Sequence, residues 1–370
     1  MSENFKYDLT ESMLPFLDRQ LAHLLLESAA KNGSTDAGRI DAQVLEGTLL
    51  ISAISAAGGD VAKAEAAKKD AEAKAASGDD SVRAKFAYDS GDYSKALELL
   101  SSVSTPQAAW GKLAAGIMNG DFATAMDSLQ KVQEGLDAKG TDALHQLNNR
   151  AWFVHWALFV LFRVDGGVDK LCELFFQSNY MSTIQASCPW ILRYLAVAAL
   201  ISAAANNNHH HAHRRIKELV RAVVQELYEY EDPVLSFIKA LYVDYDLSEA
   251  TRQLQQAQEL VAGDYFVNGH TAAFVNAARL LIVELYCRVH QCVKVESLAK
   301  VVNMPEAECE KWLYSLVKDN KIDGKVDEAA KVVKLNSKRQ SAYDQIIDKT
   351  KNLDQRNAQL LAQVHAKHEA

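Results

Sequence analysis

The sequence has few of the motifs that enzymes use. The phosphate-binding loops GxGxxG, GxxxxGKS and GxxxxGKT are absent, and so is the zinc-protease pattern HExxH. No serine or cysteine stands in a nucleophile signature, and no carboxylate stands in an apolar setting that would tune it for proton transfer. We therefore expect a protein that is not an enzyme, with no catalytic residue, no cofactor and no bound metal.

Cysteine and long apolar runs are also scarce. The N-terminus has no apolar signal segment, and the longest apolar run, 151–164, is broken by His155 and Arg163. A membrane span needs about 18 apolar residues, so we expect none. An odd number of cysteines without a CxxC pair is typical of reduced core thiols, which predicts a cytoplasmic protein. The five cysteines are Cys172, Cys188, Cys287, Cys292 and Cys309.

Positive charge is in deficit. Lys and Arg total 40 against 48 for Asp and Glu, which gives a net charge of −8. Such a balance argues against nonspecific binding to nucleic acids or membranes. The chain has 370 residues, 49% of them hydrophobic, which is enough for two or three domains with real cores.

Strand-forming sequence is nearly absent before residue 292, and amphipathic helices are expected instead. The first contains Leu14, Leu17, Leu21, Leu24 and Leu25, with Thr10 as its N-cap, and a second runs from 40 to 57. Residues 61–76 are almost wholly strong helix formers with little apolar surface beyond alanine. We interpret this stretch as a solvated spacer helix.

A short unit then recurs along the chain. Gly91-Asp92-Tyr93-Ser94-Lys95-Ala96 matches Gly120-Asp121-Phe122-Ala123-Thr124-Ala125, with a looser echo at Asp246-Leu247-Ser248-Glu249-Ala250. Each places a small alanine one turn into a helix, where it lets antiparallel helices approach closely. The pattern is typical of tetratricopeptide-like hairpins, which stack into a solenoid. The aromatic stretch 144–162 fits the solenoid core better than a ligand cage.

The residues around 206–215 form an expected polar loop with two open chemical interpretations. His209, His210, His211 and His213 could bind zinc or nickel weakly, although a structural zinc site draws ligands from more than one segment. The basic residues Arg214, Arg215 and Lys217 could contact RNA phosphates. A solvated loop and helix start is favoured over both.

Between residues 274 and 335, the helical pattern of the sequence is interrupted by strand-prone runs. A buried helix is expected over 274–290, a short strand at 292–295, and helices over 296–302 and from Pro305 to Lys318. Two strand-prone runs, 321–326 and 331–335, follow. This order predicts a winged helix. Its third helix carries Glu306, Glu308 and Glu310 near its start, which would repel a phosphate backbone, so protein docking is favoured over nucleic acid.

The last expected helix, 340–368, has a heptad seam. Its seam positions alternate in spacings of three and four: Tyr343, Ile346, Thr350, Leu353, Asn357, Leu360 and Val364. A lone helix of this kind needs a partner, and polar seam residues set its register. We interpret it as an assembly helix rather than one that packs back on its own domain.

The order of solenoid, winged helix and C-terminal helix resembles the PCI family of the proteasome lid, the signalosome and translation initiation factor 3. A finer resemblance rests on nine blocks of sequence: 7–10, 17–19, 110–114, 150–159, 188–195, 241–246, 277–292, 308–316 and 347–351. In these blocks the chain is similar to the e-subunit family of initiation factor 3, and it departs from that family at 58–80 and at the Asn/His loop.

The resemblance implies a mainly α fold: a right-handed, tetratricopeptide-like solenoid, a winged helix and a long C-terminal helix. The expected divisions are 1–60, 61–81, 82–270, 271–336 and 337–370. It further implies a non-catalytic scaffold that binds sister subunits, among them the c, d and l subunits. Through the complex it would reach the small ribosomal subunit, with a weak contact to ribosomal RNA but none to DNA or membranes.

Two surfaces are candidates for subunit contacts, the open sheet of the winged helix and the C-terminal seam. A subunit of the proteasome lid or signalosome is the alternative, and a metal-dependent enzyme using the histidine loop is a second one. The predicted interface residues are Ile322, Val326, Val332, Val333, Tyr343, Ile346, Leu353, Leu360 and Val364.

Overall fold

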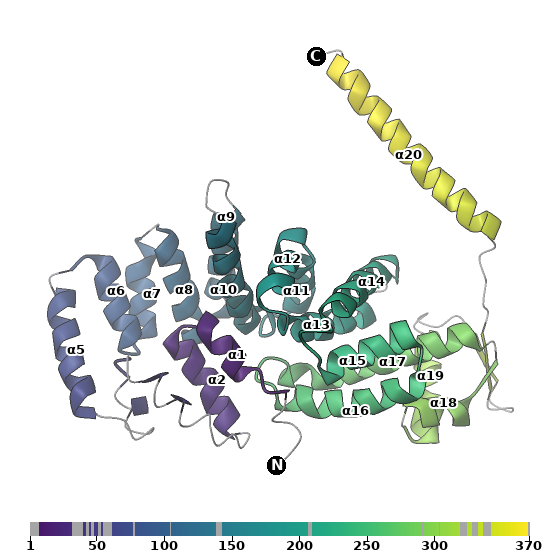
Figure 1. The fold of residues 1–370 in the computed structure, drawn as a ribbon, viewed down its shortest axis with the longest axis horizontal. Helices are drawn as coiled ribbons and strands as arrows, with labels where there is room; N and C mark the ends of the chain where they lie inside the picture. Colours follow the sequence, from purple (N-terminus) through teal and green to yellow (C-terminus); the bar gives the residue numbers. More distant parts are fainter. Residues whose placement is uncertain are drawn as a thin grey trace. The chain divides into compact units, whose positions relative to one another are not determined.

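The structure, a computed structural model, describes most of the chain (Figure 1). The described residues are 7–31, 40–41, 44–45, 48–50, 53–54, 61–76, 78–103, 105–137, 143–205, 209–290, 292–302, 304–318, 324–327, 332–335 and 342–368. They divide into two compact units, Met1–Ile282 and Val283–Ala370. Half of the second expected helix, 40–57, lies outside the described residues.

The first unit begins with a broken helix. α1 (Thr10–Met13) passes into the 3-10 turn η2 (Leu14–Phe16), and α2 (Arg19–Lys31) follows after Leu17 and Asp18. Pro15 cannot donate an amide hydrogen bond, so a single continuous helix, as the leucine spacing suggested, does not form. Thr10 is not the N-cap: it lies inside α1, and its amide nitrogen donates to Asp8 Oδ1 at 3.0 Å.

The rest of this unit is a series of helices, most of which pack against the next one along the chain, as a solenoid requires. The helix predicted over 61–76 is confirmed as α5, and its role as a spacer stays a prediction. The helices are α5 (Val61–Ala76), α6 (Asp80–Asp89), α7 (Tyr93–Ser101), α8 (Pro106–Asn119), α9 (Phe122–Asp137), α10 (Ala143–Leu161), α11 (Gly167–Phe175), α12 (Ser178–Ser187), α13 (Ile191–Ala205), α14 (His209–Glu226), α15 (Pro233–Lys239), the π-helix η3 (Ala240–Asp244), α16 (Leu247–Gly263) and the 3-10 turn η4 (Asn268–His270).

The recurring unit forms the turns of helical hairpins. Gly91 and Gly120 have φ angles of 92° and 74°, which glycine adopts readily and other residues do not. Ala96 and Ala125 are fully buried where the paired helices meet. At Gly116, a β-carbon would come within 3.2 Å of the Ala125 side chain, so the small residues permit the close approach that the sequence predicted.

The core of the unit lies in α10 and α13, which are apolar on nearly all sides. The predicted aromatic stripe of α10 is buried, except for Trp152, which is 37% exposed. Trp156 packs edge-on against Trp110, with ring centroids 5.0 Å apart. Helices that are apolar all round are stable only when other helices surround them.

The second unit contains the expected winged helix. α17 (Thr271–Val289) crosses the division between the units, and β1 (Cys292–Lys294), α18 (Val295–Val302), α19 (Glu306–Lys318), β2 (Gly324–Asp327) and β3 (Val332–Leu335) follow. The strands form one antiparallel sheet in the order β1-β3-β2. The predicted C-terminal helix is α20 (Ala342–His368). The fold class expected from the sequence is confirmed.

Candidate interaction surfaces

The winged-helix sheet is small, and its outer strands are β1 and β2. Val333 of β3 is paired with Val293 on one side and Val326 on the other, while Val332 lies in the adjacent row with Lys294 and Asp327. Each outer strand pairs along one side only within the described sheet. Backbone amide and carbonyl groups on the other side of such strands are available for pairing with another chain.

The predicted sheet contacts fall on this element only in part. Val326, Val332 and Val333 lie in β2 and β3, as expected. Ile322 lies outside the described residues. Their role in docking remains a prediction, supported by the strand order and by nothing finer.

α19 has a buried side and an acidic start. Cys309, Leu313 and Leu316 are buried, while Glu306 and Glu308 are exposed in the first turn, where they suit the positive end of the helix dipole. The three buried residues are spaced four and three apart, so they lie on one side of the helix. The two glutamates put negative charge at the helix end that would approach a phosphate backbone, which disfavours groove binding.

α20 carries apolar side chains that no other part of the described chain covers. Tyr343 is 78% exposed, and Ile346, Leu353 and Leu360 are each 58–59% exposed. Ile347 and Leu361 widen the same row and are also exposed. Thr350 Oγ1 donates to the Ile346 carbonyl at 2.8 Å, so this polar seam residue is satisfied within the helix. The side chain of Val364 lies outside the described residues.

The first unit holds a charged cluster that sequence analysis missed. Arg193, 2% exposed, donates through Nε to the fully buried Asp232, and its Nη1 lies 3.5 Å from Asp264 Oδ2. Its Nη2 donates to the Tyr7 carbonyl at 2.7 Å. One buried cation is thus shared between the fully buried carboxylate of Asp232 and the mostly buried carboxylate of Asp264, and it also fastens the N-terminal segment to α13.

Tyrosines and backbone amides complete this cluster. The hydroxyls of Tyr194 and Tyr230 donate to Asp264 and Asp232 at 2.8 and 2.6 Å. Asp232 also accepts from the Val234 amide at 3.1 Å, so it caps α15. Burial raises the pKa of Asp264 above its usual value. Burial alone would lower the pKa of Arg193, but the carboxylates of Asp232 and Asp264 hold it above the ordinary range.

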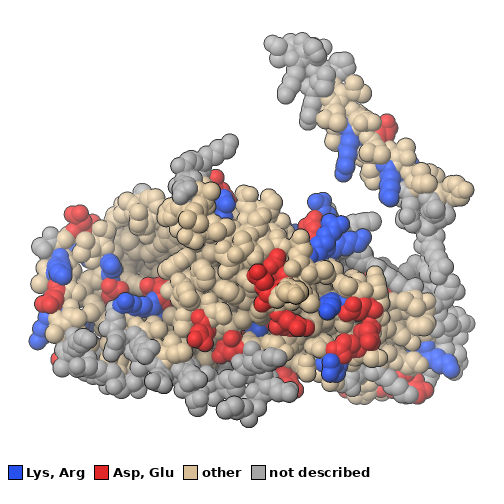
Figure 2. Space-filling model, in the orientation of Figure 1, with Lys and Arg blue, Asp and Glu red and all other residues tan. Residues whose placement is uncertain are grey.

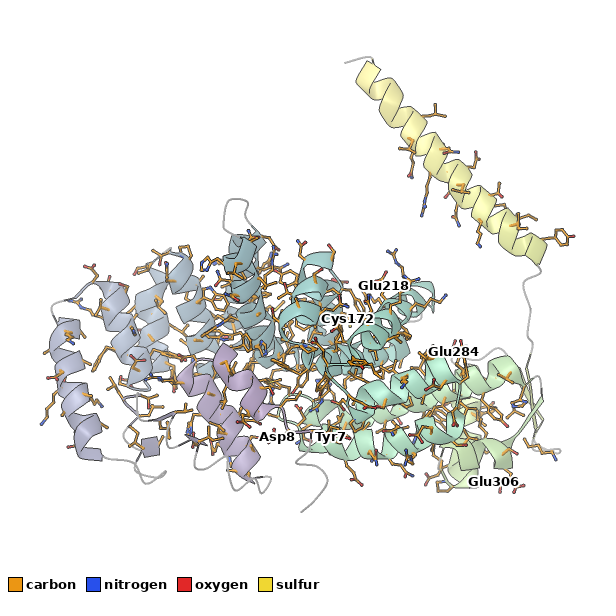
Figure 3. The ribbon with its side chains drawn as sticks, in the orientation of Figure 1. Tyr7, Asp8, Cys172, Glu218, Glu284 and Glu306 are labelled. Atoms are coloured by element: carbon orange, nitrogen blue, oxygen red, sulfur yellow. The ribbon has the colours of Figure 1, made fainter. Side chains whose placement is uncertain are left out.

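A cavity of about 320 Å³ lies beside the cluster, and Tyr7 and Asp8, labelled in Figure 3, are part of its wall. Arg193, Tyr194, Asp264 and Phe266 also line it. A second anchor holds the segment nearby: Phe16 stacks on His155 at 4.5 Å, and Trp156 Nε1 donates to the Phe16 carbonyl at 3.1 Å. These contacts join residues far apart in sequence, and both anchors hold the start of the chain against the core.

His155 is a core histidine, although it interrupts the apolar run 151–164. It is 1% exposed, its Nδ1 lies 2.7 Å from the Ala151 carbonyl, and its Nε2 accepts from Trp190 Nε1 at 3.1 Å. Because its Nε2 accepts this bond, the ring is neutral, with Nδ1 as the donor. Burial lowers its pKa to about 4, so it stays neutral at physiological pH.

The histidine segment is not a loop throughout. α14 begins at His209, so His209, His210, His211 and His213 lie in its first turns, although their side chains lie outside the described residues. Among the described residues, no group of three or more metal-ligating side chains converges. Burial raises the pKa of Cys172 and of Cys188 to about 12, so these thiols stay protonated at neutral pH. No described helix is long and apolar enough to cross a bilayer.

Comparison with known proteins agrees with this arrangement. Residues 254–337 match the PCI domain family. The chain is 40% identical to the E subunit of eukaryotic translation initiation factor 3 from Yarrowia lipolytica over 287 residues, which cover 75% of this chain and 68% of that protein. It is 40% identical to the corresponding subunit from Emericella nidulans and 41% identical to the one from Pyricularia oryzae, each over 72% of this chain and 62% of the relative.

Proposed function

Because the chain belongs to the E-subunit family of eukaryotic translation initiation factor 3, we propose that it is a non-catalytic, cytoplasmic scaffold subunit of that factor. It docks to sister subunits through its winged helix and α20, and it helps the assembled factor bind the small ribosomal subunit. The observation that carries this proposal is the row of exposed apolar side chains along α20. Family membership favours initiation factor 3 over the proteasome lid or the signalosome.

The exposed row on α20 supports a helix-to-helix contact. Four apolar seam residues, Tyr343, Ile346, Leu353 and Leu360, lie along one side of the helix, and with Thr350 and Asn357 between them the seam alternates in spacings of three and four. Burying a side chain of this size contributes about 1.5–3 kcal/mol, so four of them provide a substantial driving force for association. The polar Thr350 and Asn357 would select one register with the partner helices.

The sheet supports a second contact of a different kind. β1 and β2 are its outer strands, and pairing another strand along either would satisfy backbone groups without demanding a particular side-chain sequence. Ile322, Val326, Val332 and Val333 are the side chains that we propose accompany this pairing. The c, d and l subunits are the proposed neighbours.

Two substitutions test the role of α20. Ile346→Asp together with Leu353→Asp places two carboxylates in the proposed buried seam, which costs several kcal/mol in a bound state but little on an exposed helix. We expect at least a tenfold loss of initiation factor 3 subunits that co-purify with the tagged full-length chain. Quantitative mass spectrometry of the purified complex gives this ratio.

The matched control is Asn352→Asp with Gln359→Asp. It adds the same two charges at exposed positions of α20 outside the seam, and it should leave co-purification unchanged. Full retention of the subunits by the seam variant would exclude α20 as an assembly element. Recovery of proteasome-lid or signalosome subunits with the unmodified chain would replace the proposed complex with the alternative one.

A further inference from the structure

Three hairpin turns of the first unit share one construction. Asp92, Asp121 and Asp246 each precede a helix, and their carbonyls each accept a 3.0 Å hydrogen bond from an alanine amide four residues on. These alanines are Ala96, Ala125 and Ala250, and all three are fully buried. The turn before Asp246, between α15 and α16, is therefore the structural equivalent of the turns at Gly91 and Gly120.

The third turn contains one residue more than the other two. The amide of Asp92 bonds to the Ala87 carbonyl and that of Asp121 to the Gly116 carbonyl, five residues back in each case. The amide of Asp246 bonds to the Ala240 carbonyl, six residues back. This additional residue accounts for the π-helix η3. Single-turn π-helices are rare and occur frequently at functional sites.

The third turn also has a strained residue where the others have glycine. Gly91 and Gly120 have φ angles of 92° and 74°, and Tyr245 occupies the same position with a φ of 54°. Among the described residues, it is the one non-glycine with a positive φ. A tyrosine is disfavoured in this conformation because its β-carbon crowds the backbone, and glycine is not.

Packing does not explain why tyrosine stands there. Tyr245 is 66% exposed and Val243 is 41% exposed, and Asp244 and Asp246 are exposed as well. The whole turn therefore presents its side chains to solvent. A strained backbone that displays an exposed aromatic ring points to a binding role rather than to folding.

We propose that the Val243–Asp246 turn is a docking element for a cationic segment of a partner protein. An arginine or lysine of that segment would lie over the ring of Tyr245, with Asp244 and Asp246 on either side as counter-charges. Asp246 Oδ1 accepts from the amides of Ser248 and Glu249 at 2.9 and 3.2 Å, which holds this carboxylate in place.

The charge of the surface selects the class of partner. On the visible face, acidic side chains gather over α15 and α16 with a few basic ones among them, whereas basic side chains gather over α14 (Figure 2). Two carboxylates beside the ring would repel a phosphate backbone, so a basic protein segment fits the turn and a nucleic acid does not. The proposal holds whichever complex contains the chain.

Site-specific photo-crosslinking identifies the occupant. The full-length chain, with benzoylphenylalanine at position 245, replaces the native protein in cells and is irradiated. We expect crosslinks to another protein, at a peptide with arginine or lysine within about five residues of the attachment point, and at least a tenfold lower yield from position 228. Tyr228 is the control because it is a fully exposed aromatic outside the turn. Crosslinks to RNA, to the same chain alone, or to nothing would overturn the proposal.

A stability measurement separates docking from a structural role. Tyr245→Gly removes the backbone strain and little packing, so the melting temperature of the purified chain should stay equal or rise by about 2 °C. A synthetic peptide with the sequence of the crosslinked basic segment should bind this variant at least tenfold more weakly than it binds the unmodified chain. Gly120→Tyr, the reciprocal change at the equivalent turn, should lower the melting temperature by about 2 °C or more. A fall of several degrees in Tyr245→Gly would show that the ring is structural and would overturn the proposal.

Discussion

α10 and α20 are both long helices, and they treat the same residue types in opposite ways. Leu158 and Phe153 of α10 are fully buried, whereas Leu353 and Leu360 of α20 are 58% and 59% exposed. From Ala151 to Leu161, α10 is buried on nearly all sides, and α20 is polar except for one narrow row. The first pattern demands enclosure by the same chain, and the second leaves a face for another chain. Stability and assembly are thus assigned to different helices.

The sharpest test makes the same substitution in both helices. Leu158→Asp would bury a carboxylate at a position with no solvent exposure, and we expect a loss of about 5 kcal/mol or more in the free energy of unfolding. Urea denaturation measures the change. Leu158→Met, which conserves volume, should cost under about 1.5 kcal/mol. A loss below about 1 kcal/mol for Leu158→Asp would mean that α10 is not part of the core.

The charged cluster gives the next largest effect. Arg193→Met keeps much of the apolar stem but leaves Asp232 and Asp264 buried without their cation, at a cost of about 3–5 kcal/mol. Arg163→Met is the control, because Arg163 is an exposed arginine that lies over the ring of Tyr265, and it should cost under about 1 kcal/mol. Equal losses from the two variants would contradict the role given to Arg193.

This cluster also has a signed pH dependence. Burial already raises the pKa of Asp264, and removal of Arg193 raises it further, so the folded variant binds a proton more tightly than the unfolded chain. The stability of the variant therefore rises as pH falls toward this pKa. We expect the deficit of Arg193→Met relative to the unmodified chain to be smaller at pH 5 than at pH 8 in urea denaturation.

His155 links the core to pH in the opposite direction. Its folded pKa of about 4 lies below the usual 6.5, so the unfolded chain takes up the proton first as pH falls. The contribution of neutral His155 to the free energy of unfolding is complete above pH 6.5. It falls by up to about 3 kcal/mol as pH drops from 6.5 to 4. His155→Phe should show a shallower loss over this range. Parallel stability curves for the two proteins would contradict the assignment.

The smallest effect on stability is expected for a substitution in the exposed row of α20. Leu353→Asp changes an exposed side chain, so the free energy of unfolding of the isolated chain should change by under about 0.5 kcal/mol. Urea denaturation under the conditions used for Leu158→Asp measures the difference. A loss of several kcal/mol would mean that α20 packs against its own chain and that the contrast with α10 is wrong.

Local sequence patterns predicted the elements whose signals are local. The three-and-four spacing located α20, and the Gly-Asp units located the turns at Gly91 and Gly120. The strand-prone runs were right within about three residues, since β1, β2 and β3 occupy the expected stretches. These features depend on residues close together in the sequence, so the spacing of apolar residues and the residue types in turns are enough to predict them.

Features that depend on distant residues could not be predicted in this way. The sequence around Arg193 does not indicate that Asp232, Asp264 and the Tyr7 carbonyl surround this residue in the folded chain. Pro15 is a helix-breaking residue in the sequence, but the leucine spacing on both sides of it favoured one continuous helix in the prediction. The π-helix η3 follows from one additional residue, which becomes evident only when the hydrogen bonds of the three turns are aligned.

The anchoring of the N-terminal segment has a consequence for how the protein is made. The Tyr7 carbonyl accepts its hydrogen bond from Arg193, which is synthesised 186 residues later. At a synthesis rate of about 5–20 residues per second, the segment spends roughly 10–40 s without its binding site after it is translated. During that interval its apolar side chains, including Met13 and Phe16, lack their partners in the core, and the segment can dock fully only after α13 has been synthesised.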